Sequence, residues 1–165
     1  MIGVKMHKPN ELEDDPFWKT FPLEGADVSK ICYYPHGSDE YGRVYSKLEK
    51  DIQLFNRGDT IELDSEKLEN YETISYEGWD QELEAIQHLV RKGREGNPRI
   101  FFISDDFHDP IVEMGVDVLL LNLSGLREQF PYYWVLCIDN RWILESRFAG
   151  RLTRGEFSLI GKEPA

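Results

Sequence analysis

Apolar residues recur at helical spacing in two segments of the chain. In residues 41–55 they follow one another at intervals of three or four residues, with Ser38 and Asp39 as candidate N-caps and Gly58 behind the last turn. Residues 79–92 carry a second apolar stripe, with acids in the first half and bases at the end, an order that complements the helix dipole. We therefore predict a helix in each segment.

Between and after these helices, shorter apolar patterns indicate strands. Residues 59–64 and 71–77 alternate between apolar and acidic positions, which predicts two strands with one acidic face each, joined by a short helical turn at 65–70. Residues 99–104 and 116–123 are apolar on both faces, which is typical of interior strands. We predict strands in all four segments.

The C-terminal region reads as a meander. Residues 132–138 are apolar on both sides, Asp139 and Asn140 supply a turn, and residues 142–148 alternate, which predicts a hairpin with one solvent-facing side. A further turn is predicted at 153–156, before a final short strand at 157–160.

Taken together, these elements predict an α+β fold for residues 1–165 as a single layered domain. Its mixed or antiparallel β-sheet would be covered by the two main helices, which are available to cover one side. Residues 1–30 are rich in Pro, Asp and Glu without a sustained period, so they are expected to form an irregular arm docked on the core. Cys32 and Cys137 both sit in apolar aromatic runs, where a reduced, buried thiol is the common state.

Charge changes this picture, because the chain has 31 acidic and 19 basic residues and a net charge of −12. Residues 59–84 contain ten carboxylates and one cation, Lys67. An acidic chain lacks the basic face that nucleic-acid phosphates or anionic membranes require. The N-terminus also has no apolar signal segment. We therefore expect a cytoplasmic protein that binds neither nucleic acid nor membrane.

The acidic stretch favours a docking face for a basic protein, although a solvated face that keeps the protein soluble and monomeric is the alternative. Aromatic residues placed among the acids are suited to anchor a partner inside a charged rim. The residues predicted to bind the partner are Glu62, Asp64, Glu66, Glu69, Tyr71, Glu72, Tyr76, Glu77, Asp80, Glu82 and Glu84.

One loop offers candidate chemistry. Asp105, Asp106, His108 and Asp109 follow the predicted strand at 99–104, and strand ends in mixed sheets commonly present ligands for divalent cations. The same residue types also form side-chain-to-backbone turns, which is the simpler interpretation. The sequence lacks CxxC, HExxH, GxSxG and GxGxxG motifs, so no catalytic residue, resident metal or cofactor is predicted, and the chain is not expected to be an enzyme.

A small, acidic, single-domain chain without a catalytic motif resembles, in type, bacterial toxin-immunity proteins. The resemblance rests on size, charge and the absence of motifs, and it implies a one-to-one inhibitor that covers a surface of a basic toxin such as a nuclease. Such a protein would be a monomer or a small homo-oligomer. Two alternatives remain open: a phage-type inhibitor that mimics nucleic acid with the same residues, and a small metal-dependent hydrolase centred on residues 105–109.

Overall fold

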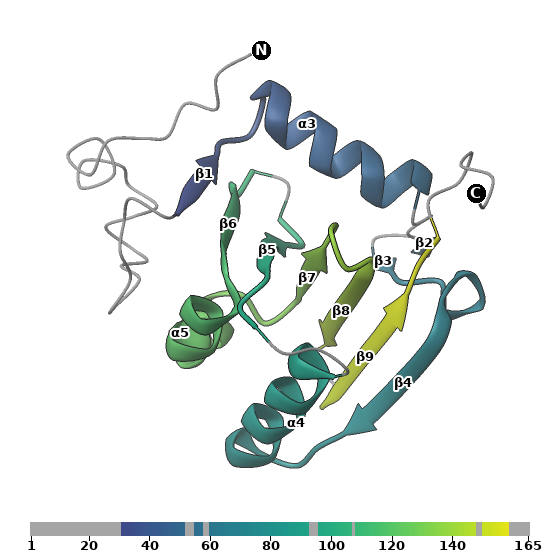
Figure 1. Ribbon diagram of the computed structural model, residues 1–165, viewed down its shortest axis with the longest axis vertical. Helices are drawn as coiled ribbons and strands as arrows, with labels where there is room; N and C mark the ends of the chain where they lie inside the picture. The colour runs from purple at the N-terminus through teal and green to yellow at the C-terminus, as the bar shows by residue number, and fades with distance from the viewer. Residues whose placement is uncertain are drawn as a thin grey trace.

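A seven-stranded sheet forms the centre of the computed structural model, which describes residues 31–51, 55–57, 60–92, 96–106, 108–147 and 150–158 (Figure 1). All neighbouring strands are antiparallel, in the order β1-β6-β5-β7-β8-β9-β4. Their bounds are β1 Cys32–Tyr34, β4 Glu69–Ser75, β5 Arg99–Ser104, β6 Ile111–Gly115, β7 Tyr133–Cys137, β8 Trp142–Arg147 and β9 Arg151–Glu156. A separate pair joins β2 (Phe55–Arg57) to β3 (Thr60–Glu62). The α+β fold class is confirmed.

Helices cover both faces of this sheet. Because side chains alternate along a strand, Phe102 and Ile103 of β5 enter different apolar clusters. The cluster around Phe102 is closed by α4 (Trp79–Arg91) and α5 (Val116–Gln129). The cluster around Ile103 is closed by α3 (Asp39–Ser46), which continues into a π-helical turn. The two predicted helices are therefore present but lie on opposite sides of the sheet, and the expectation that they cover one side is wrong.

The beginning of α3 agrees with the sequence, but its end does not. Ser38 is the N-cap, and its side chain accepts a hydrogen bond from the backbone N–H of Tyr41 at 3.2 Å. The helical part ends with the π-helical turn Lys47–Asp51, and Phe55 already belongs to β2. Apolar spacing alone does not separate a last helical turn from a short strand that follows it. The predicted arm at 1–30, together with Ile52, Gly58 and Asp59, lies outside the described residues.

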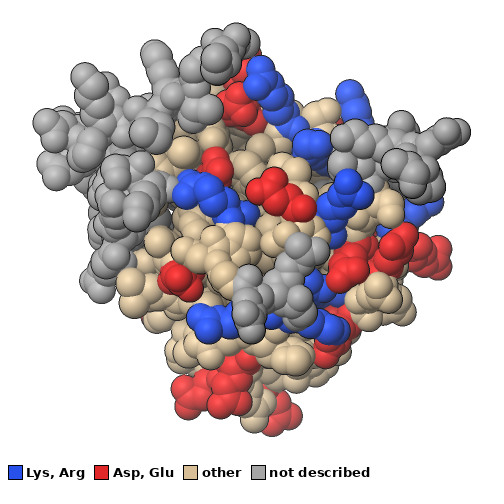
Figure 2. Space-filling view, in the orientation of Figure 1, with Lys and Arg blue, Asp and Glu red and all other residues tan. Residues whose placement is uncertain are grey.

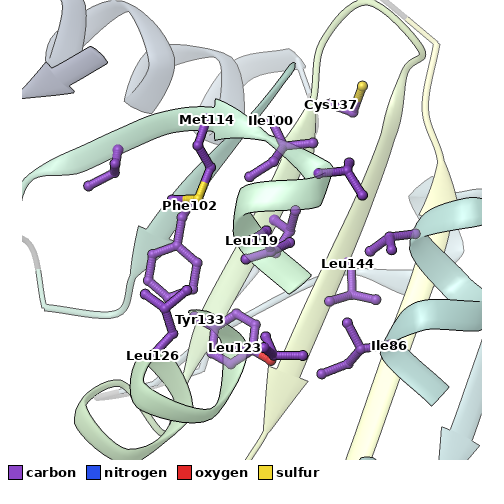
Figure 3. Packing of buried hydrophobic residues seen from close by; sticks show 14 of the residues in the cluster. Ile86, Ile100, Phe102, Met114, Leu119, Leu123, Leu126, Tyr133, Cys137 and Leu144 are labelled. Atoms are coloured by element: carbon purple, nitrogen blue, oxygen red, sulfur yellow. The ribbon is translucent and has the colours of Figure 1, made fainter. Parts of the chain in front are cut away.

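The largest correction concerns α5, which occupies the segment predicted as an interior strand. Leu119, Leu123 and Leu126 are buried at intervals of three and four residues, whereas Leu121 is 63% exposed, a distribution that fits a helix and not a strand. Figure 3 shows these three leucines among the side chains of the sheet. None of the described helices is long and apolar enough to cross a membrane.

The strands around α5 also differ from the prediction. β6 was missed entirely, and it forms a hairpin with β5 before the chain turns into α5. β9 occupies residues 151–156, where a turn was expected, because Thr153 and Gly155 pair with Glu145 and Ile143 of β8. The final strand predicted at 157–160 therefore lies too late in the chain, and residues 159–160 are outside the described part.

Close packing at Gly155 provides a test of this register. A Cβ at Gly155 would lie 2.6 Å from Leu68 Cδ1 and 2.7 Å from Leu68 Cβ. We expect Gly155→Ala to lower the free energy of unfolding by about 1–3 kcal/mol, measured by urea denaturation, because overpacking a buried site forces side chains off their rotamers.

Gly125 in α5 is the matched control, since a Cβ there meets nothing within 4 Å. Gly125→Ala should raise stability by about 0.5–1 kcal/mol through helix propensity. In a Leu68→Gly background, which removes both of these Leu68 atoms, Gly155→Ala should cost much less; an equal cost in both backgrounds would contradict the clash.

Candidate functional site

The predicted acidic residues divide into three places instead of one. β4 explains the division, because its alternate side chains point to opposite faces of the sheet. Tyr71 and Thr73 lie on the side of β3, whereas Glu72 and Ile74 face α4. In Figure 2 acidic side chains gather over the loop before β4 and, separately, over the beginning of α4. The acids therefore do not form one continuous surface.

The first place is a cavity of about 350 Å³ against the outer part of the sheet, which we call the β4 cavity. Local structure brings its residues together: Glu62 ends β3, and Asp64 caps the short 3-10 turn Ser65–Lys67 by accepting a hydrogen bond from the N–H of Glu66 at 3.0 Å. Its lining includes Glu62, Asp64, Glu66, Tyr71, Glu145 and Arg151. Four of the predicted binding residues thus meet at one concave site.

Glu145 is a buried carboxylate of this cavity, and the sequence did not single it out. It is 7% exposed, and its Oε2 accepts hydrogen bonds from Trp134 Nε1–H at 2.9 Å and from the N–H of Leu63 at 2.7 Å. Arg147 bridges the two sides of the site, because its Nε lies 3.4 Å from Glu145 Oε1 and its Nη1 pairs with Glu62. The prediction that one side of the hairpin of β7 and β8 faces solvent is wrong at Glu145, since the loop after β3 covers this residue.

The second place lies on the other face of β4. Glu72 Oε2 accepts a hydrogen bond from Lys92 Nζ at 2.5 Å, and His88 Nε2 lies 3.8 Å from its Oε1. The hydrogen bond with Lys92 is the main cause that lowers the pKa of Glu72. Glu82 is buried and pairs with Arg127 of α5. Both carboxylates already have a cationic partner within the chain.

The third place is exposed surface, and the remaining predicted residues lie either there or beside Glu82. Glu77, Asp80 and Glu84 are exposed around the beginning of α4, and Glu69 accepts a hydrogen bond from Ser158 Oγ at 3.1 Å. Tyr76 is half-buried under the start of α4, so it is not an exposed anchor. Tyr71, at 57%, is one of the exposed large side chains in the described residues.

The loop at 105–109 is held by its own turn. Asp106 Oδ1 accepts from the N–H of His108 at 2.9 Å, and Ser104 Oγ donates to Asp109 Oδ2 at 2.6 Å. Burial raises the pKa of Asp105, whereas the bonds from His108 lower that of Asp106. Within the described ranges, no group of three or more His, Cys, Asp or Glu residues could hold a metal ion.

Two arginines of β8 and β9, Arg147 and Arg154, pair with carboxylates of the same chain. Arg147 contacts Glu62 and Glu145, and Arg154 Nη1 lies 3.6 Å from Glu156 Oε1.

None of the known family models and none of the curated proteins matches this chain. The chemistry of the described residues therefore carries the functional argument.

Proposed function

We propose that this chain is a binding protein of the immunity type, which neutralises a basic protein in the bacterial cytoplasm and makes its central contact at the β4 cavity. The partner would be a toxin such as a nuclease, inhibited by steric and electrostatic blocking. The observation that carries the proposal is the convergence of Glu62, Asp64 and Glu66 with Tyr71 at one concave site. Lysine and arginine side chains are the natural counterpart of such a site.

Charge and exposure support the β4 cavity as the contact. Four carboxylates line it against one arginine, Arg151, and Arg147 adds a second cation through its pairing with Glu62 and Glu145. The site therefore keeps an excess of two negative charges. Tyr71 stands exposed on β4, at the edge of the sheet, where its ring can pack on an aliphatic stem or a cation of a partner.

The other predicted acids take a different role in this proposal. Glu77, Asp80 and Glu84 would steer a basic partner from a distance, because their side chains are exposed and apart from the cavity. A nucleic-acid mimic requires carboxylates in succession along one surface. The division of the acids between the β4 cavity and α4 supports a protein partner over that alternative.

The test compares two double variants of the tagged full-length chain, used to capture proteins from a lysate of the source organism at low salt. Glu66→Lys with Tyr71→Ala alters the β4 cavity, and Asp80→Lys with Glu84→Lys alters the exposed acids of α4. We expect the cavity variant to weaken capture of one basic protein by roughly 10–100-fold, since it removes an anchor and reverses a central charge. The α4 variant should mainly slow association and make it less sensitive to salt.

Circular dichroism and urea denaturation would establish that both variants remain folded. Equal loss of capture in the two variants would contradict the β4 cavity as the contact. An eluate in which no basic protein depends on the cavity would overturn the proposed function.

A further inference from the structure

A second cavity, also of about 350 Å³, lies between the first turn of α4 and the last turns of α5. We call it the Glu82 cavity, and its lining residues are Tyr76, Glu82, Arg127, Glu128 and Pro131. Glu82 is only 1% exposed, whereas the side chain of Arg127 is 39% exposed. The cavity is thus lined by a nearly fully buried carboxylate and by a guanidinium group that is partly exposed to solvent.

Glu82 differs from Glu145, the other buried carboxylate among the residues that the structure describes. Glu145 has two N–H donors on one oxygen, as expected of a carboxylate with a structural role. Glu82 Oε2 instead pairs with Arg127 Nε, and the carboxylate also takes a hydrogen bond from the Tyr76 hydroxyl, so its partners are side chains that line the cavity.

Burial and charge act in opposite directions on the carboxyl group of Glu82. Burial raises the pKa of Glu82, while Arg127 and then Tyr76 oppose the rise by favouring the carboxylate form. Burial and the nearby Glu82 raise the pKa of Tyr76 to about 12, so its hydroxyl remains a donor. The cavity therefore combines the guanidinium of Arg127 with the carboxyl groups of Glu82 and Glu128 and the hydroxyl of Tyr76.

Arg127 packs on an aromatic side chain as well as pairing with Glu82. Its guanidinium lies over the ring of Trp79, with 5.1 Å between its Cζ and the ring centroid. The contact with Glu82 is made through Nε, so the two terminal amino groups can face a carboxylate in the fork geometry that arginine prefers. A simple anion would be repelled by Glu82 and Glu128, and a simple cation by Arg127.

From this arrangement we propose that the Glu82 cavity binds a free α-amino acid, with Arg127 holding its carboxylate and Glu82 accepting hydrogen bonds from its ammonium group. The volume is at the lower end of small-molecule sites, which suits a ligand of this size. The inference is independent of the β4 cavity, because the two sites lie on opposite faces of β4.

The first test uses the full-length wild-type chain and a panel of L-α-amino acids, observed by saturation-transfer NMR and then titrated by calorimetry. The matched probes are the same amino acids with the amino group acetylated or the carboxylate amidated. We expect free amino acids to bind and both blocked forms to fail. Binding by no amino acid, or equal binding by blocked and free forms, would overturn the proposal.

The second test places the ligand at the carboxylate. Glu82→Gln should weaken binding at least about tenfold, which corresponds to about 1.4 kcal/mol. Glu49→Gln, at an exposed position of the π-helical turn that follows α3, should bind like the wild type. A folded Glu82→Gln variant with unchanged affinity would refute the assignment, and if this variant fails to fold, the comparison of blocked and free amino acids on the wild type decides.

Discussion

Replacing Glu145 by alanine should lower the free energy of unfolding by about 2–4 kcal/mol, one of the two largest effects that we expect for a single substitution in this chain. The change removes the acceptor for Trp134 Nε1–H and for the N–H of Leu63, and it takes one of two carboxylates from Arg147. The two donors would be left unpaired on a buried surface. Urea denaturation followed by tryptophan fluorescence would measure the loss and would also report on Trp134.

Two further variants separate the hydrogen bonds from the charge. Both donors reach the same atom, Oε2, so Glu145→Gln can keep them with its carbonyl oxygen and lose only the ion pair with Arg147. We expect Glu145→Gln to recover much of the stability that Glu145→Ala loses. Glu84→Ala, on the exposed side of α4, should change stability by less than about 0.5 kcal/mol. An equally small effect of Glu145→Ala would show that the buried carboxylate does not hold the β3 loop on the sheet.

Local chemistry made part of the fold predictable. α4 combines an apolar stripe with acids in its first turn and bases in its last, so pattern and helix dipole agree on one element. Ser38 likewise identified the start of α3. In α5 Asp117 stands in the first turn and Arg127 in the last, but the apolar residues between them are not confined to one stripe, so the pattern resembles a buried strand. Its N-terminus is capped from a distant loop, where Asn97 Oδ1 accepts from the N–H of Asp117 at 2.9 Å.

The prediction of the site residues was limited in the same way, because it grouped only residues that are close in the sequence. Glu62, Asp64, Glu66 and Tyr71 are neighbours in the sequence, so a charge pattern could group them. Glu145 was placed on a wet face, because sequence alternation does not reveal that the loop after β3 covers it. Glu82 was counted among exposed acids, since only the packing of α4 on α5 brings Arg127 to it. Leu63 and Arg127, which contact these two carboxylates, lie far from them in the sequence, so the charge and apolar patterns of one sequence do not identify them.

The corrected assignment of α5 leads to a matched pair of substitutions, Leu123→Ala and Leu121→Ala. In a strand the two side chains would share one face and respond alike, whereas in a helix they lie on different sides. Leu123 is fully buried in the cluster below α4 and α5, and Leu121 is largely exposed.

We expect Leu123→Ala to lower the free energy of unfolding by about 2–5 kcal/mol, because it removes buried methyl groups and leaves a cavity. Leu121→Ala should change it by less than about 0.5 kcal/mol, since its side chain stands in solvent. Parallel urea titrations of the two variants would measure the difference. Equal losses would favour a strand over the helix, and with it a different packing of the sheet on which both proposed sites depend.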